Sequence, residues 1–219
     1  MKDVVRINKL DLKFIVEGKG KNILFIHGLN SNYNLLKKLI LELSKSYKCW
    51  CLNLPKYGDY KVEDYVKILK QFIKIKKINN PILIGHSLGG IICLKLIEER
   101  IEYSSLIMIN TPLIGKAPKI VLMALDLFNF IIRKSVLKSY LEGFRDVTKK
   151  IIKIPEVKIN KPFLVIYGNY DFLIKISNGE CYNNLNPSKV IYGNFGHLAP
   201  LTHYKKISLI IKNFLIENL

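Results

Sequence analysis

The chain has 219 residues, of which 49% are hydrophobic, and a formal net charge of +18 at pH 7. This length suits one α/β domain with a sizeable core, and no Pro-, Ser- or Gly-rich linker divides it, so we expect a single domain over residues 1–219. The longest apolar tract, residues 120–132, carries Asp126 and Asn129. It is shorter than the roughly 20 residues that a membrane-spanning helix needs, which excludes a transmembrane segment there.

The excess of positive charge suggests a nucleic acid or an anionic membrane as partner. Only four of the 35 basic residues are Arg, however, and the Lys residues are scattered along the chain. Bidentate recognition of phosphates or bases favours Arg, so we interpret the charge as a compositional bias and expect no specific nucleic-acid partner. A weak association with anionic surfaces is the alternative.

The cysteines and the N-terminus indicate a cellular compartment. The four cysteines, at positions 49, 51, 93 and 181, form no C-x-x-C pair and have no His at ligand spacing, so we expect reduced thiols and no metal site. No apolar run of signal-peptide length precedes Lys9. We therefore expect a cytoplasmic protein.

The first half of the chain alternates β-type runs with helical patterns. Residues 4–7 and 12–16 predict a hairpin. Apolar runs predict strands at residues 22–27, 49–54, 82–84 and 106–110, and helical spacing of apolar residues predicts helices near 35–43, 62–73 and 88–100.

The second half begins with a helical pattern from residue 116 to about 153, with a break near 133–135. A strand over 161–168, a short helix near 177–184, a strand at 190–192 and a last helix at 207–215 follow. Continuously apolar strands alternating with helices predict an α/β fold with a mostly parallel, doubly wound sheet. Ligands of such sheets bind beyond the carboxyl ends of the strands.

The stretch Gly85-His86-Ser87-Leu88-Gly89 is a G-x-S-x-G motif between a predicted strand and a predicted helix. Gly85 and Gly89 have no Cβ atom to collide as strand and helix close on each other, and the tight turn pushes the Ser87 hydroxyl outward. The N–H of Leu88, in the first turn of the helix, is free to bind an oxyanion. A Gly-rich turn with a chance serine is the alternative.

A base for Ser87 has to come from four histidines. His27 and His86 lie within Gly-bearing turns, and His203 lies near the start of the last helix, where a solvated His is expected. His197 follows the last predicted strand and is the candidate that takes the Ser87 proton.

The second ring nitrogen of His197 needs an acceptor that holds the tautomer and stabilises the imidazolium. Asp171, at the exit of the strand that ends at Gly168, is suited to this role. Asp146 and Glu180 lie in predicted helical segments and are less suited to a fixed inward contact. Asp171 as a turn-forming residue is the alternative.

These residues resemble the α/β-hydrolase superfamily over nearly the whole chain. The matching pieces, in chain order, are His27-Gly28-Leu29, Gly85-His86-Ser87-Leu88-Gly89-Gly90, Gly168-Asn169-Tyr170-Asp171 and Gly196-His197. The order of nucleophile, acid and histidine is that of the family. The resemblance implies Ser87 as nucleophile, Asp171 as acid, His197 as base, and the backbone amides of Leu29 and Leu88 as the oxyanion hole.

Residues 113–160 resemble the helical cap of the family, inserted before the strand that carries the acid. An apolar face of this segment, which includes Leu125 and Phe128, suggests contact with an apolar acyl group, with His27 as a further substrate contact. Packing of the cap on the core is the alternative for these apolar residues.

Two features bear on the subfamily. Residues 53–60 lack the D-x-x-G-x-G-x-S pattern that members often carry, which weakens any subfamily assignment. Ser87 stands where the resembling dehalogenases and epoxide hydrolases use Asp, which excludes those two classes.

The sequence therefore predicts a serine hydrolase that cleaves a small-molecule carboxylic ester or thioester through an acyl-enzyme, with no cofactor and no metal. An acyltransferase or a peptidase with the same triad is an alternative enzyme. A non-catalytic binding protein of the same fold is the alternative outside enzymes.

Overall fold

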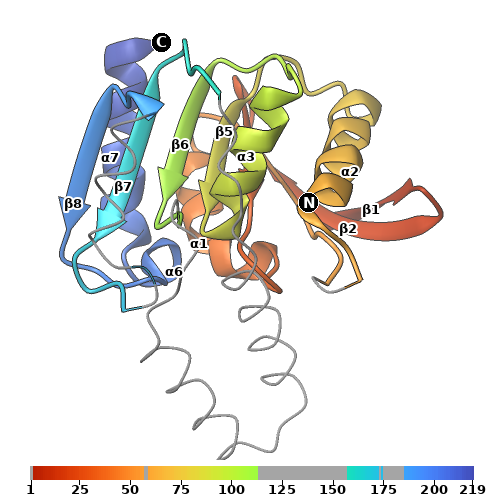
Figure 1. Ribbon diagram of the computed structural model, residues 1–219, viewed down its shortest axis with the longest axis horizontal. Coiled ribbons are helices and arrows are strands. Elements are labelled where there is room, and N and C mark those ends of the chain that lie inside the picture. The colour runs from red at the N-terminus through yellow and green to blue at the C-terminus, as the bar shows by residue number, and fades with distance from the viewer. Residues whose placement is uncertain (1, 57–58, 113–156, 173, 175–184) are drawn as a thin grey trace, which may run out of the picture.

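A computed structural model describes residues 2–56, 59–112, 157–172, 174 and 185–219 (Figure 1). Within these residues eight strands form one sheet in the order β1-β2-β4-β3-β5-β6-β7-β8. The strands are β1 (Lys2–Ile7), β2 (Leu10–Glu17), β3 (Asn22–Ile26), β4 (Lys48–Leu52), β5 (Ile82–His86), β6 (Ser105–Ile109), β7 (Phe163–Gly168) and β8 (Lys189–Gly193). The helices are α1 (Tyr33–Leu43), α2 (Val62–Ile75), α3 (Leu88–Glu98), α6 (Ala199–Thr202) and α7 (Tyr204–Asn218).

The sheet is mostly parallel, as the sequence predicts. β1 and β2 form the expected hairpin, and Asn8 and Lys9 at its turn have φ values of 47° and 67°. Two successive positive φ angles match the right-handed twist of the flanking strands. β2 pairs antiparallel with β4, and the pairs from β4 through β3 to β8 are all parallel.

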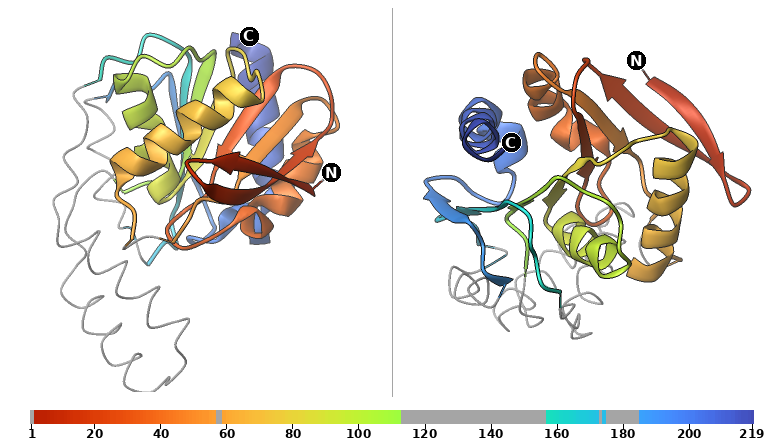
Figure 2. Two further views of the ribbon diagram at one scale, coloured as in Figure 1. Left: turned by 90° about the vertical axis from the view of Figure 1, so that its right-hand side faces the viewer. Right: turned by 90° about the horizontal axis from the view of Figure 1, so that it is seen from above.

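Helices cover both faces of the sheet. Neighbouring residues of β4 show the alternation, because Cys49 and Cys51 pack in the cluster that contains residues of α1 and α7, whereas Trp50 packs in the cluster that contains residues of α2 and α3. Figure 2 shows the sheet between these two pairs of helices. The doubly wound architecture is thereby confirmed.

The hydrophobic pattern of a helix reflects how much of its surface packs against the core. The central helix α3 buries nine of its 11 residues, which explains why its sequence is apolar on nearly all sides. α2 buries the stripe Tyr65, Val66, Ile68, Leu69 and Phe72 and exposes Lys67 and Lys74 to solvent. None of the helices in the described ranges is long and apolar enough to cross a bilayer.

Some expectations fall on residues that the structure does not describe. Most of the expected cap at 113–160 lies outside the described residues, including Leu125 and Phe128, and so does the helix expected near 177–184. The described end of the cap segment, residues 157–160, has no regular secondary structure, and Ile159 is buried in the core on the α2 and α3 face.

The structure also contains an element that the sequence reading missed. The single-turn helix α6 follows the loop that carries His197, with Pro200 in its first turn, where a missing N–H is tolerated. Four residues are too few for a helical period, so no pattern predicts this turn. The last helix begins at Tyr204, three residues before the expected start.

Candidate active site

Ser87 occupies a strained turn between β5 and α3. Its φ is 54° and its ψ is −125°, a backbone conformation that costs a non-glycine residue about 1–3 kcal/mol. Two hydrogen bonds hold the turn: the Ser87 amide donates to the Ile109 carbonyl at 3.0 Å, and the Gly90 amide donates to the Ser87 carbonyl at 3.0 Å. The first bond continues the β5–β6 pairing, so the sheet itself fixes the serine.

The glycines around Ser87 allow α3 to approach the sheet closely. A Cβ atom on Gly89 would lie 2.0 Å from the Ile26 carbonyl oxygen, and one on Gly85 would lie 2.4 Å from the Gly90 Cα. Real Cβ atoms do not come this close to backbone atoms. The glycine positions of the motif are therefore required by packing, as the sequence suggests for Gly85 and Gly89.

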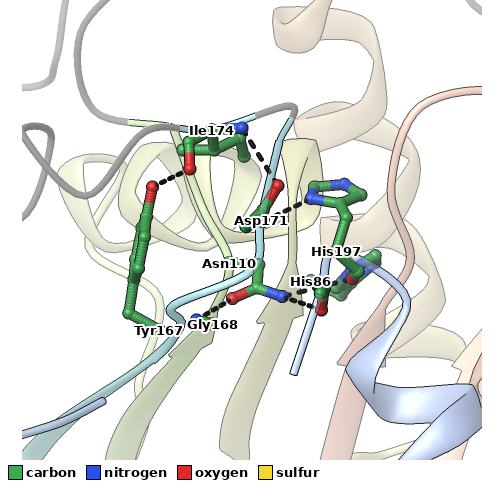
Figure 3. A network of polar contacts seen from close by, with 8 residues as sticks. His86, Asn110, Tyr167, Gly168, Asp171, Ile174 and His197 are labelled. Carbon is green, nitrogen blue, oxygen red and sulfur yellow. Dashed lines mark hydrogen bonds and ion pairs between the residues drawn. The ribbon is translucent and has the colours of Figure 1, made fainter. Parts of the chain in front are cut away.

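Asp171 and His197 form a hydrogen-bonded pair at the carboxyl ends of β7 and β8 (Figure 3). His197 Nδ1 lies 2.8 Å from Asp171 Oδ2, and the Asp171 side chain is fully buried, whereas that of His197 is 9% exposed. An ionised carboxylate only accepts hydrogen bonds, so Nδ1 carries the proton. In the neutral ring this leaves a lone pair on Nε2, which is able to accept a proton.

The chain around Asp171 is fixed from both sides. The other carboxylate oxygen, Oδ1, accepts from the Ile174 amide at 3.0 Å, and the Tyr167 hydroxyl donates to the Ile174 carbonyl. Burial raises the pKa of Tyr167, with a further contribution from the Asp171 charge. The hydroxyl therefore remains a donor, and β7 holds the segment that carries the acid.

The loop after β3 is held by His27. Its Nδ1 donates to the Gly28 carbonyl at 2.9 Å and its Nε2 accepts from the Leu54 amide at 3.0 Å. Burial lowers the pKa of His27 to about 4, against the opposing effect of the Gly28 hydrogen bond, so the ring is neutral at pH 7. Both ring nitrogens thus contact backbone, and a contact between His27 and substrate stays a prediction.

The two expected oxyanion donors flank the nucleophile. Leu88 follows Ser87 directly, and a Cβ atom on Gly28 would lie 3.1 Å from the Ser87 Cβ, which places the loop that contains Leu29 against the serine. Neither the Leu29 nor the Leu88 amide donates a hydrogen bond within the described part of the chain. Both N–H groups are therefore available to an acceptor. Their role as an oxyanion hole stays a prediction.

The structure brings the predicted triad members to the same edge of the sheet. His86, which precedes Ser87, donates from Nε2 to the His197 carbonyl at 2.9 Å, and the centroids of the two rings are 5.0 Å apart. The hydrogen bonds of the described residues include none between the Ser87 hydroxyl and the His197 ring. Such bonds are often long in unliganded enzymes.

Sequence reasoning missed two polar residues around this site. Asn110, which follows β6, binds both β7 and the loop that carries His197. Asn53, which follows β4, accepts from the Tyr33 amide at 2.9 Å and so holds the start of α1. The available signal was a single Asn directly after an apolar strand in each case, which is too common to indicate a role.

Comparisons with known proteins agree with this geometry. A family model described as the alpha/beta hydrolase fold matches residues 21–130, half of the chain. The chain is 23% identical to the uncharacterized hydrolase YugF of Bacillus subtilis over 245 aligned positions, which cover 89% of this chain and 90% of that protein. It is 37% identical over 82 residues to "Putative esterase/lipase 2" of Mycoplasma genitalium, which is 33% of this chain and 31% of that protein. The match thus spans about a third of the mycoplasma relative's length.

A solved structure shows the same architecture. An epoxide hydrolase from Bacillus megaterium superposes with a TM-score of 0.79 over 97% of this chain and 99% of that chain, at 17% identity. At this identity the likeness concerns the fold alone. With a family match over half of the residues, and with the sheet order and the serine turn described above, the chain belongs to the α/β-hydrolase family.

Proposed function

We propose that the chain is a serine hydrolase that cleaves a carboxylic ester or thioester through an acyl-enzyme on Ser87. The observation that carries this proposal is the buried pair of Asp171 and His197, 2.8 Å apart, at the edge where Ser87 is held in a strained turn. A nucleophile, a base and a group that orients the base are the parts that nucleophilic catalysis requires.

In the first half of the reaction, the Ser87 Oγ forms a bond to the substrate carbonyl carbon while His197 Nε2 takes the hydroxyl proton. The carbonyl π electrons move to oxygen, and the Leu29 and Leu88 amides donate to the resulting oxyanion. Asp171 stabilises the imidazolium that forms. The oxyanion then reforms the carbonyl as the bond to the leaving group breaks, and His197 gives its proton to the leaving alcohol or thiol.

In the second half, a water molecule attacks the acyl-enzyme. His197 takes a proton from the water as its oxygen bonds to the acyl carbon, and a second tetrahedral oxyanion forms at the same amides. Collapse of this intermediate returns the proton to Ser87 Oγ and releases the carboxylic acid. The route uses only side chains, backbone amides and water.

Two observations support an ester or thioester as substrate. The mycoplasma relative carries an esterase/lipase name. The chain has a serine at the turn between β5 and α3, and a serine nucleophile is suited to acyl transfer. We further propose that residues 113–160 form a cap whose apolar side chains, Leu125 and Phe128 among them, contact the acyl group.

The proposal is tested with a fluorophosphonate probe, which phosphonylates an activated serine, followed by mass spectrometry of the labelled peptide. We expect one label, on Ser87, and none in the Ser87→Ala protein. The exposed Ser46 provides a matched control, since Ser46→Ala should label like the parent. Labelling at another serine, or none in the folded parent protein, would contradict the proposal.

A further inference from the structure

The backbone carbonyl of His197 accepts hydrogen bonds from two buried side chains at the ends of neighbouring strands (Figure 3). His86 Nε2, at the end of β5, lies 2.9 Å from this oxygen, and Asn110 Nδ2, directly after β6, lies 3.2 Å from it. A carbonyl oxygen has two lone pairs, so these two donors use its full capacity. The contact fixes the His197 main chain beside the residue that precedes Ser87.

Asn110 connects this carbonyl to the strand that carries the acid. Its Nδ2 also donates to the Gly196 carbonyl at 3.0 Å, and its Oδ1 accepts from the Gly168 amide at 2.8 Å. Only a side chain with a donor and an acceptor side by side is able to bind both the carbonyls of the His197 loop and the Gly168 amide. Asn110 also has a φ of 47°, a value that Asn adopts more readily than most other non-glycine residues.

The His86 ring uses only one of its two nitrogens for a hydrogen bond within the described part of the chain. Because Nε2 donates to a carbonyl, the lone pair of the neutral ring lies on Nδ1, and Nδ1 is buried without a hydrogen-bond partner among the described residues. Burial is the main cause that lowers the pKa of His86 to about 3, so the ring is neutral at pH 7. An unpaired buried polar atom is destabilising. An apolar ring at this position would avoid that penalty but would lose the bond to His197.

We propose that His86 and Asn110 are positioning residues that hold the His197 main chain at the ends of β5, β6 and β7 and so direct its imidazole at Ser87. This inference rests on the proposed roles of Ser87 and His197. Asp171 fixes the ring at Nδ1, and the two side chains fix the backbone from which the ring extends. A displacement of about 1 Å in a catalytic group costs on the order of 100-fold in rate.

The test removes each donor separately and compares kcat with KM on p-nitrophenyl acetate. Asn110→Ala and His86→Phe should lower kcat and the rate of fluorophosphonate labelling by about 10-fold to 100-fold, with KM within about twofold, since the binding surface is unchanged. His86→Gln keeps an N–H near the Nε2 position and should recover most of the lost kcat. Asn169→Ala is the matched control, because its exposed side chain binds Asn194 and not His197.

A second readout is independent of activity. In protein labelled with ¹⁵N-histidine, the Nδ1–H of His197 should exchange with water faster in Asn110→Ala and His86→Phe than in the parent, at temperatures where all three are folded. Parent-like exchange in both folded variants would overturn the inference, as would parent-like labelling rates. Absence of labelling in the parent would count against the proposed function instead, while the exchange measurement would still decide the positioning role.

Discussion

His197 donates from Nδ1 to Asp171 Oδ2 over 2.8 Å, although the two residues are separated by 26 positions in the chain. The parallel pairing of β7 with β8 brings their carboxyl ends together, with Gly168 opposite Gly193. A Cβ atom on Gly168 would lie 2.2 Å from the Phe195 carbonyl oxygen, so glycine lets the loop that carries His197 approach β7 closely. The pairing of β7 with β8 and the glycine at position 168 therefore bring the side chains of Asp171 and His197 together.

Replacement of Asp171 by Asn should keep the fold and lower kcat. The amide would favour the wrong tautomer of His197, an effect of about 10⁴ in a comparable triad. The measurement is kcat on p-nitrophenyl esters, together with thermal unfolding to verify the fold.

Glu180 is one of the two acidic residues, with Asp146, that the sequence offers as alternatives to Asp171, and it gives the control. Glu180→Gln should leave kcat near that of the parent. A large loss in Glu180→Gln with parent-like turnover in Asp171→Asn would show that the acid is assigned wrongly.

Substitution of Gly89 by Ala should destabilise the protein. The new Cβ would meet the Ile26 carbonyl oxygen at 2.0 Å, where only backbone movement relieves the clash; overpacking of this kind costs about 1–3 kcal/mol or more. Gly196→Ala is the matched control, since its nearest contact would be the Tyr170 carbonyl oxygen at 3.2 Å. Urea unfolding measures both free energies, and equal losses would contradict the packing argument.

Acid should destabilise the fold through His27 and His86. Their pKa values in the folded protein are lowered from 6.5 to about 4 and about 3, mainly by burial. Below pH 6.5 the unfolded chain therefore binds more protons than the folded one, so the free energy of unfolding decreases as the pH falls. Each group contributes a slope of up to about 1.4 kcal/mol per pH unit, and its stabilisation is fully present only above its unfolded pKa.

Urea unfolding between pH 7.5 and 4.5 at constant ionic strength measures this slope. His86→Gln removes one of the two groups, so its stability should fall less steeply with decreasing pH than that of the parent. Parallel curves for the two proteins would show that His86 does not contribute.

The sequence predicts the alternation of strands and helices and the serine turn because both depend on local patterns. Continuous apolar runs specify strands buried on two faces, and the Gly85-to-Gly89 motif needs close packing of α3 that only glycine permits. The sequence also predicts that His197 and Asp171 lie near each other, since each follows a predicted strand and the ends of parallel strands meet at one edge. The structure places the two side chains within hydrogen-bond distance, and their catalytic roles stay a prediction.

The remaining features depend on contacts between distant residues. Asn110 binds Gly196 and His197, which follow it in the chain by 86 and 87 positions. Nothing near Asn110 in the sequence indicates these partners. A contact between His27 and substrate stays a prediction. The backbone partners of its two ring nitrogens become apparent only when the loop after β4 is placed beside it. Helix α6 has four residues, which are too few to show the hydrophobic period of a helix in the sequence.

The cap prediction is tested through substrate choice. Leu125→Ala or Phe128→Ala should change the relative kcat/KM across p-nitrophenyl esters of increasing acyl length, with one methylene worth about 1 kcal/mol in an apolar pocket. Labelling of Ser87 by a small probe should stay near the parent rate. A parent-like chain-length profile in both variants would exclude these residues as determinants of acyl length.

Trapping of the acyl-enzyme tests the central claim most directly. The parent protein is mixed with a p-nitrophenyl ester, quenched in acid within the burst of p-nitrophenol release, digested and analysed by mass spectrometry. We expect the peptide that contains Ser87 to gain the mass of the acyl group, with about one p-nitrophenol released per active site in the burst and neither signal in Ser87→Ala. Turnover of the ester with acyl mass on a different residue, or unchanged turnover in Ser87→Ala, would contradict an acyl-enzyme at Ser87.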